Sequence, residues 1–310
     1  MKRGNVILSL FASIFCLFVF TDNAKCRQTN DLMSLAKARK YMLVLINQDR
    51  MSHGLNPVTM ESIATNAGQK HAEEMAKYCY LAHWDREGKL PEERYNEAGG
   101  SGFDEENVYL GMHYYGNEPK GPMQLEVNPT FTRKEIEDIE STYMNETPPD
   151  DGHRRNILDP DHTRVGIALA KSKTANAEVI TNTQEFVNDA IKVYNLPTIA
   201  DVGANVTVAG RLIGGYRFRA VTVGRDATPS PMSVDDLRMT RSYGMPPAYA
   251  TYYPRGYVTP EPVIFTNSGV FYVTVNLSDA GKPGLYYISI WLQDNTGRDF
   301  IASQRTILVN

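Results

Sequence analysis

The sequence predicts an α+β fold in its first part and a small all-β sandwich in its last part. Residues 30–190 open with segments of helical periodicity and close with two apolar strands. From Asn205 onward, apolar and polar residues alternate with the period of a β-strand. A chain of 310 residues is long enough for two hydrophobic cores. We therefore expect a signal peptide at 1–24, a first domain at 25–190, a linker at 191–203 and a β-sandwich domain, Ig-like or similar, at 204–310.

The N-terminus has the layout of a secretory signal peptide. Lys2-Arg3 precedes an apolar run over residues 6–20, shorter than the roughly 20 residues that a membrane-spanning helix needs. An uncleaved anchor is the alternative, because Asp22 stands where the cleavage region favours a small residue. We expect cleavage, a secreted (extracellular or periplasmic) protein, and no transmembrane segment after the signal peptide.

Charge and cysteine content limit the classes of partner and site. The formal net charge is −4 and no Lys/Arg-rich run follows the first residues, which argues against a nucleic-acid partner. After cleavage two cysteines remain, Cys26 and Cys79. They can pair in an oxidising compartment or stay as two thiols, and the sequence leaves both alternatives open. The absence of a Cys-x-x-Cys motif disfavours a zinc ribbon or a redox site.

Two helices are expected near the start of the first domain. Apolar residues recur at helical spacing over 32–48, with Asp31 as the N-cap, and again over 60–78. The apolar face of the second helix includes His71. A single histidine on an apolar face is most often a hydrogen-bonded core residue, so we expect that role for His71.

The region after the second helix is expected to be mostly loop. His83 stands just past the helix, where a side chain can project into a cleft. Residues 98–109 are polar and rich in glycine and acidic residues, which is typical of a solvated loop. His113 and His162 also fall in loops, and we expect both at the surface. Taken singly, neither His83 nor Glu106 indicates a functional site.

A third helix has a clear start signal. Thr132 and Glu135 form a capping box, with Phe131 and Ile136 as its hydrophobic staple. We expect this helix to carry Glu146 on its inward face. A buried carboxylate costs several kcal/mol unless it is paired.

The expected partner of Glu146 lies in the segment that follows. Pro148-Pro149 ends the helix and returns the chain to a histidine turn, residues 151–160, which contains His153. His153 is therefore the natural partner. Strands at 164–170 and 179–186 then close the first domain.

The last part of the chain reads as a sandwich of strands. The expected strands lie at 206–208, 216–223, 271–277, 286–292 and 302–309. The Tyr/Pro-rich segment 245–257 is either a binding face or an ordered loop packed on the sandwich. No catalytic constellation is visible in this half.

Several short motifs, in order and spacing, identify a family. They are Asn47-Gln48-Asp49-Arg50, Gly54-Leu55, His71-Ala72-Glu73-Glu74-Met75-Ala76, His83, Glu106-Asn107-Val108, Gly152-His153-Arg154-Arg155-Asn156-Ile157-Leu158, Val165-Gly166-Ile167-Ala168 and Gln184-Glu185-Phe186. On these residues, positions 41–186 resemble the CAP superfamily, also called the SCP-like extracellular domain, in its bacterial form. The C-terminal sandwich lies outside the resemblance.

The resemblance implies an α-β-α sandwich with a cleft that holds two histidines and two acidic residues. Carried over by motif, these are His83, Glu106, Glu146 and His153, with Glu140 as the fallback for Glu146. The chain departs from the family pattern at Glu105, where a glycine commonly precedes the Glu-Asn step. Glu105 adds negative charge beside the cleft.

Two imidazoles and two carboxylates permit three kinds of chemistry. They can hold a divalent cation, Zn²⁺ or Mg²⁺/Ca²⁺, with His83, His153, Glu106 and Glu146 as candidate ligands. They can act as a metal-free acid/base system in which each carboxylate raises the pKa of its histidine. They can also be a polar network that fixes the loops of a binding cleft.

Two functional hypotheses follow, and the sequence leaves open whether the protein is an enzyme. We favour a secreted, non-enzymatic binding protein whose cleft takes an extracellular or envelope ligand, namely a lipid, a glycan, a peptide or a cation. The alternative is a metal-assisted, peptidase-like hydrolase that uses the same cleft. Neither a Gly-x-Ser-x-Gly nor a His-Glu-x-x-His motif occurs.

Overall fold

The computed structural model describes residues 32–114, 121–240 and 242–310. The expected signal peptide, the Asp31 cap and Cys26 lie outside the described residues, so signal-peptide cleavage and a Cys26–Cys79 disulfide stay predictions. Residues 32–310 form one compact unit. None of the helices in the described ranges is long and apolar enough to cross a membrane.

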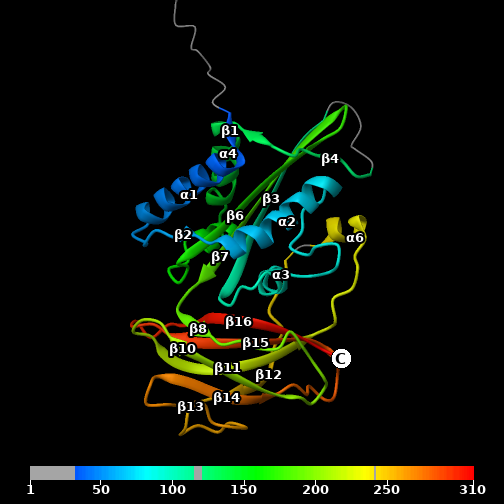
Figure 1. Ribbon diagram of the computed structural model, residues 1–310. Helices are drawn as coiled ribbons and strands as arrows, with labels where there is room; N and C mark the ends of the chain where they lie inside the picture. The colour runs from blue at the N-terminus through cyan, green and yellow to red at the C-terminus, as the bar shows by residue number, and fades with distance from the viewer. Residues whose placement is uncertain (1–31, 115–120, 241) are drawn as a thin grey trace, which may run out of the picture. The chain divides into compact units, whose positions relative to one another are not determined.

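A mixed sheet forms the centre of the first part of the chain (Figure 1). Its strand order is β2-β6-β7-β3, and β4 pairs with the far end of β6. β3 and β7 are antiparallel over their full length, from Phe103 opposite Asn188 to Tyr114 opposite Ala177. The bounds are β2 Thr59–Met60, β3 Phe103–Tyr114, β4 Gln124–Leu125, β6 Arg164–Lys173 and β7 Ala177–Asn188; a separate pair is β1 Met33–Ser34 with β5 Thr130–Phe131.

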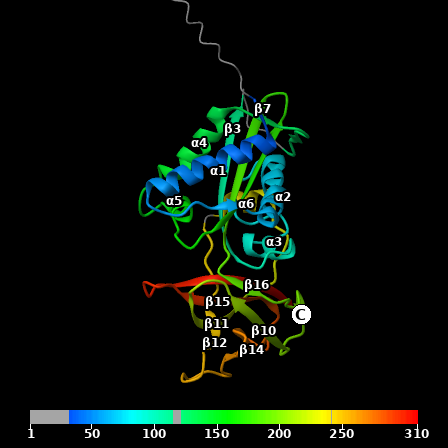
Figure 2. The same ribbon diagram turned by 60° about the vertical axis from the view of Figure 1, so that its left-hand side comes forward.

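Helices cover both faces of this sheet, which gives three layers (Figure 2). One face carries α1 (Leu35–Ser52), α4 (Arg133–Met144) and α5 (Gly152–Ile157), whose apolar residues pack with Val165, Ile167 and Leu169 of β6. The other face carries α2 (Ser62–Tyr78) and α3 (Pro91–Glu97). Small residues face α2, among them Ala168 and Ala170 of β6. Alternate residues of β6 therefore serve the two cores. The expected α+β fold is confirmed.

A glycine lets α2 lie directly on the sheet. A Cβ atom built on Gly166 of β6 would be 2.4 Å from the backbone carbon of Ala64 in α2. No side chain fits in that space, so the helix and the strand touch through their backbones.

The helices expected from periodicity are present. The capping box of α4 is confirmed: the Glu135 amide donates to Thr132 Oγ1 at 3.2 Å, and Glu135 Oε2 accepts from the Thr132 amide at 2.6 Å. Glu146 does not lie on this helix as expected, because α4 ends at Met144 and Glu146 comes after the cap residue. The histidine turn is also more regular than expected, since His153 lies within α5.

The expectation of a loop over 98–109 is correct for residues 98–102 and wrong for residues 103–109. Residues from Phe103 onward form β3, and the preceding helix α3 was not predicted. Asp104 and Glu106 are buried, at 1% and 3% exposure. Their polar character hid the strand, because both faces of the sheet are covered. Inside the protein Glu106 is paired with Arg94, and burial raises the pKa of Asp104 well above its usual value.

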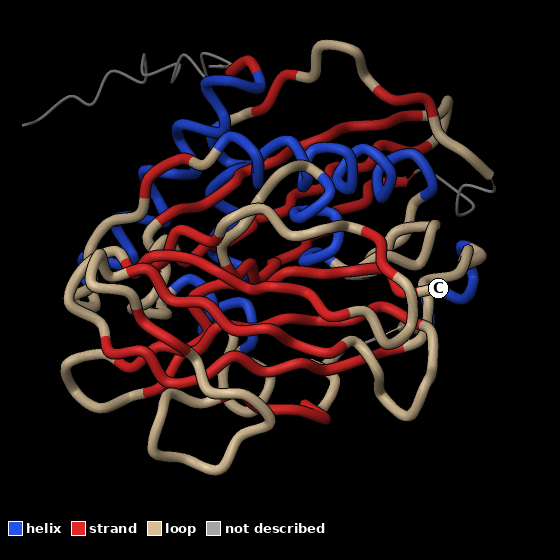
Figure 3. Tube along the Cα trace, turned by 60° about the horizontal axis from the view of Figure 1, so that its bottom comes forward, coloured by secondary structure: helices blue, strands red, loops and turns tan. Residues whose placement is uncertain are grey.

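The last part of the chain forms two stacked sheets (Figure 3). One has the order β13-β14-β10-β8 and the other β12-β11-β15-β16-β9, with a continuous apolar core that includes Phe271, Val273 and Ile290. The bounds are β8 Ile191–Val193, β9 Ile199–Ala200, β10 Asn205–Leu212, β11 Arg217–Asp226, β12 Ala248–Tyr252, β13 Ile264–Phe265, β14 Val270–Asn276, β15 Gly284–Gln293 and β16 Asp299–Val309. The expected β-rich region is confirmed, and the segment expected as a linker contributes β8 and β9.

The two parts are joined by more than the chain connection. Asn188 at the end of β7 donates from Nδ2 to the Ile301 carbonyl at 2.7 Å, and Asn96 donates to the Gln304 carbonyl at 3.1 Å. Between β11 and β12 the chain also leaves the sandwich and forms α6 (Val234–Met239), which lies near α2 (Figure 1). Leu237 of α6 is fully buried in a cluster with side chains of the first part.

Candidate functional site

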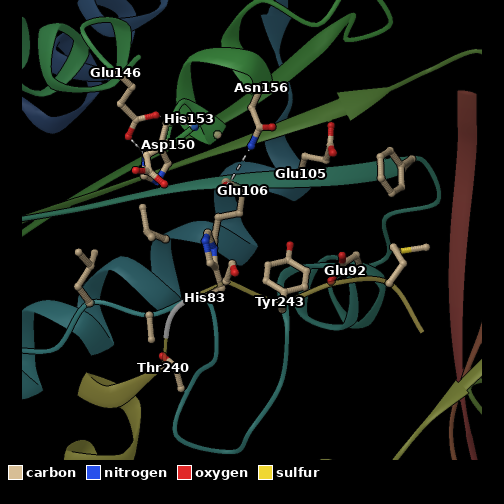
Figure 4. Close-up of a pocket in the computed structure, with 17 residues that line it drawn as sticks. His83, Glu92, Glu105, Glu106, Glu146, Asp150, His153, Asn156, Thr240 and Tyr243 are labelled. Atoms are coloured by element: carbon tan, nitrogen blue, oxygen red, sulfur yellow. Dashed lines mark hydrogen bonds and ion pairs between the residues drawn. The ribbon is translucent and has the colours of Figure 1, made fainter. Parts of the chain in front are cut away.

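The four side chains singled out from the sequence line one cavity of about 620 Å³ (Figure 4). They come from four different places in the fold. His83 lies in the loop after α2, Glu106 on β3, Glu146 just past α4, and His153 in α5. Glu140, the fallback for Glu146, is 3% exposed and is not among the lining residues.

The four residues form two histidine–carboxylate pairs. His83 Nδ1 is 3.0 Å from Glu106 Oε1, and His153 Nδ1 contacts Glu146 Oε1. Glu146 Oε2 also accepts the His153 amide at 2.9 Å. Because Nδ1 of each ring is engaged, Nε2 of each ring is left to meet a ligand.

An arginine that the sequence analysis missed neutralises one of the carboxylates. Arg94 of α3 donates from Nη2 to Glu106 Oε2 at 2.7 Å and from Nη1 to the His83 carbonyl at 2.7 Å. The side chain of Glu106 is fully buried and that of Arg94 is 7% exposed. Arg94 therefore holds both members of the first pair in place. No local signal pointed to it, because α3 itself was not predicted.

Burial and Arg94 together lower the pKa of His83 from 6.5 to about 4. Burial is the larger cause, because it disfavours the charged ring. Of the three kinds of chemistry that the sequence left open, the acid/base system with a raised histidine pKa is therefore disfavoured at His83. At neutral pH His83 is an uncharged ring that donates from Nδ1 to Glu106.

A second buried carboxyl group shares the environment of Glu106. Burial raises the pKa of Glu185 well above its usual value, and the nearby Glu106 raises it further. Burial also raises the pKa of Glu106, but Arg94 opposes that effect. The ion pair with Arg94 keeps the negative charge on Glu106, so Glu185 carries the proton.

His71 has the core role expected for it. It is 1% exposed, and its Nε2 is 2.8 Å from the Ala82 carbonyl. Burial lowers its pKa well below the usual value. The ring therefore contributes a neutral wall behind Glu106, whose Oε2 lies 4.0 Å away.

Amide side chains fix α5 against the sheet. Asn107 donates from Nδ2 to the His153 carbonyl at 3.1 Å, and Asn156 donates to Asn107 Oδ1 at 3.0 Å. Asn107 also donates to Gln184 Oε1 of β7 at 3.1 Å. This network sets the position of His153 relative to β3, which carries Glu106.

The segment after α6 supplies another wall of the cavity. Its lining residues are Thr240, Ser242, Tyr243 and Met245. The Tyr243 ring is 5.1 Å from the His83 ring and 5.8 Å from the Trp84 ring, edge to face in both cases. Sequence patterns could not reveal this wall, because it depends on a contact between distant parts of the chain.

The four cleft residues do not form a compact set of metal ligands. Within the described residues, the set of His, Cys, Asp and Glu side chains whose ligand atoms lie within 4.8 Å of one another is Glu105, Asp159 and His162. His162 was expected at the surface, but it is only 2% exposed. Phe186 stacks on its ring, with centroids 5.3 Å apart, and this packing accounts for the burial.

Comparison with known proteins gives one family. The model of the cysteine-rich secretory protein family, CAP, matches residues 43–186. No curated protein matches the chain.

Similar solved structures include two bacterial proteins. An extracellular protein containing an SCP domain from Bacillus anthracis is 15% identical, with a TM-score of 0.35; the match covers 50% of this chain and 41% of that one. An outer surface protein from Borrelia burgdorferi is 13% identical, with a TM-score of 0.37, and the match covers 51% of this chain and 99% of that one. The chain therefore spans about two fifths of the length of the Bacillus protein. The family match therefore identifies a CAP-like domain at residues 43–186 of this chain.

Proposed function

We propose that the protein is a secreted CAP protein whose cleft binds an extracellular ligand that is neutral or positively charged. The proposal rests on the residues that line the cavity. Its carboxylates are Glu92, Glu105, Glu106, Glu146 and Asp150. Its apolar side chains include Leu81, Phe103, Val108, Tyr243 and Met245.

This lining favours particular ligand chemistry. A volume of about 620 Å³ falls in the range of roughly 300–1,000 Å³ typical of small-ligand sites. Arg94 neutralises Glu106, but the other carboxylates, among them Glu105 and Asp150, attract amines and hydrogen-bond donors and repel anionic headgroups or acidic sugars. The aromatic and aliphatic side chains offer contacts to an apolar group. A basic peptide segment or another amine-bearing ligand fits both features best.

The pairing inside the cleft favours binding over turnover. The neutral His83 donates to Glu106, and Glu106 is also bound by Arg94, so this pair is a fixed wall at neutral pH. A group poised for acid/base catalysis has a pKa near the working pH, which His83 lacks. Burial raises the pKa of Glu106 to about 7, but this carboxylate is fully buried and is held by both Arg94 and His83.

A divalent cation is compatible with this proposal as a bridge between ligand and protein. Nε2 of His83 and His153 would be its ligands, because each Nδ1 is held by a carboxylate. Glu106 and Glu146 would orient the rings, as carboxylates commonly do for metal-bound histidines.

Binding panels of cationic, neutral and anionic peptides, glycans and lipid vesicles test the proposal. We expect cationic or neutral ligands to bind the wild type, with at least tenfold weaker binding after Tyr243→Ala or His153→Ala. Tyr114→Ala, at an exposed position on the same strand as Glu106, is the control and should bind as the wild type does. A preference for anionic ligands, or equal binding by all variants, would contradict the proposal.

The hydrolase alternative is tested on the same samples. Wild-type protein loaded with Zn²⁺ or Mg²⁺ is incubated with a broad peptide library, and the products are followed by mass spectrometry. Cleavage that disappears in His153→Ala would replace the binding-only function with catalysis in this cleft.

A further inference from the structure

Next to the cleft, three side chains converge from two segments of the CAP domain. Glu105 is on β3, beside Glu106 (Figure 4). Asp159 and His162 are in the loop between α5 and β6. Their ligand atoms lie within 4.8 Å of one another. We propose that Glu105, Asp159 and His162 form a Zn²⁺-binding site at the edge of the cleft. It shares Glu105 with the lining of the cleft, but its ligands do not include His83 or His153.

The buried histidine is the first reason. The ring Nδ1 of His162 is 2.8 Å from Asn188 Oδ1, an acceptor, so Nδ1 carries the hydrogen. Nε2 is then free to offer a lone pair. It is buried and makes no hydrogen bond with any residue that the structure describes. Glu105 Oε2 is 3.1 Å from Nε2, but it does not lie in the direction along which an Nε2–H group would point, so the two atoms form no hydrogen bond. The free lone pair of His162 Nε2 beside two carboxylates is an arrangement that can bind a metal ion.

The spacing of the donors is the second reason. Ligand atoms at 2.0–2.2 Å around a tetrahedral Zn²⁺ are about 3.3 Å apart. The separation of 3.1 Å between His162 Nε2 and Glu105 Oε2 is close to that value. One histidine and two carboxylates supply three ligands, and water can complete the site.

The loop that carries two of the ligands is held in place from behind. Arg50 is fully buried and donates to the carbonyls of Ile157, Asp159 and His162 at 2.7, 2.8 and 3.0 Å. The Asp161 amide donates to Asp159 Oδ1 at 2.8 Å. These bonds preorganise the site, because the ligand-bearing backbone does not have to be ordered when the ion binds.

The charge of the neighbourhood also favours a cation. The nearby cation Arg298 is paired with Asp161 at 2.6 Å. Glu105 and Asp159 bring two carboxylates to the site, and the cations Arg50 and Arg298 offset part of the charge of Asp159. The side chain of Glu105 is 36% exposed, which leaves a path for the ion from solvent.

Zn²⁺ titration of the full chain after chelator treatment tests the site, by calorimetry. We expect Glu105→Gln and His162→Gln each to lower the affinity for one bound Zn²⁺ ion at least tenfold. His113→Gln, at an exposed histidine on β3, is the matched control and should bind Zn²⁺ as the wild type does. The double variant His83→Ala/His153→Ala should still bind this Zn²⁺ ion, which distinguishes the site from any ion held by the two cleft histidines.

Two outcomes would overturn the proposal. One is a wild type that binds no Zn²⁺ outside the His83/His153 cleft, which would make the cluster an ion pair with protonated His162. The other is wild-type affinity in Glu105→Gln. If His162→Gln fails to fold, Glu105→Gln and Asp159→Asn still decide, because neither of these side chains is fully buried. Anomalous diffraction at the zinc edge should place the ion against His162 Nε2.

Discussion

Arg94 and Glu106 form a buried ion pair, with Nη2 2.7 Å from Oε2 and side-chain exposures of 7% and 0%. The pair connects α3 to β3 beneath the cleft. A buried carboxylate without a counter-charge is very costly. Arg94 is therefore what allows an ionised Glu106 to lie inside the protein and hold His83.

Replacing Arg94 by methionine should destabilise the protein by about 3–5 kcal/mol, because it leaves Glu106 buried without its partner. Denaturant unfolding followed by circular dichroism measures the change. Lys134→Met is the matched control: Lys134 pairs with Asp138 on the surface, with exposures of 80% and 55%, and this variant should lose much less stability than Arg94→Met. Equal losses in the two variants would show that burial adds nothing to the Arg94–Glu106 pair.

His83 should make the protein less stable at acid pH. Its pKa is lowered from 6.5 to about 4, so between these values the unfolded chain binds a proton that the folded chain does not. Stability contributed by this group is present above pH 6.5 and is lost as the pH falls toward 4. The difference is about 3 kcal/mol.

Comparing wild type with His83→Gln isolates this effect from the other titrating groups. The stability difference between the two proteins should shift in favour of the variant by about 3 kcal/mol between pH 7 and pH 4. Titration of the His83 ring by NMR should give a pKa that rises in Arg94→Met. A pH-independent difference would mean that His83 has the same pKa in the folded and the unfolded protein.

Glu140 should act in the opposite direction. Burial raises its pKa to about 8, and Gln184 Nε2 donates to it at 2.8 Å. Between pH 4.5 and 8 the folded chain holds a proton that the unfolded chain has lost, so stability falls as the pH rises through this window. The full effect is about 5 kcal/mol.

Glu140→Gln should remove that loss. The variant should match the wild type near pH 4 and exceed its stability by several kcal/mol at pH 9, because an amide needs no proton to stay neutral. Glu178→Gln, at an exposed position, should follow the wild type throughout. Parallel curves for Glu140→Gln and wild type would place the ionised carboxylate in the core.

Features with a local signal could be predicted from the sequence. The capping box at Thr132 and Glu135 depends on residues three positions apart, and the strand at Val270–Asn276 on strict alternation. The residues His83, Glu106, Glu146 and His153 followed from motif order, and they line one cavity. Their use for binding, metal or catalysis stays a prediction.

Buried charged residues and contacts between distant segments of the chain could not be predicted from the sequence. α3 contains Glu92, Glu93 and Arg94, and all three are buried. Charged residues normally indicate a solvated surface. Arg94 is buried with its partner Glu106 on β3, and burial raises the pKa of Glu92 and Glu93 to about 7. The same holds for Tyr243, whose place beside His83 depends on a segment that leaves the sandwich.

That segment provides a final prediction, about how the wall of the cleft is held. Leu237 of α6 is fully buried with Met75, Tyr80, Ala82 and Val108, whereas Met239 of the same helix is 74% exposed. Arg238 adds hydrogen bonds to the Cys79 carbonyl at 3.0 and 3.2 Å. A helix of six residues has little stability of its own, so α6 depends on these contacts.

Leu237→Ala should remove about 2–5 kcal/mol of packing and release the segment locally. Amide hydrogen exchange should accelerate over residues 232–245 while β15 and β16 keep their protection, because the sandwich core does not include Leu237. Trp84, which contacts Tyr243, should report the opening by a change in fluorescence. Met239→Ala is the control and should leave exchange unchanged. Unchanged exchange in Leu237→Ala would mean that contacts other than Leu237 hold the wall of the cleft.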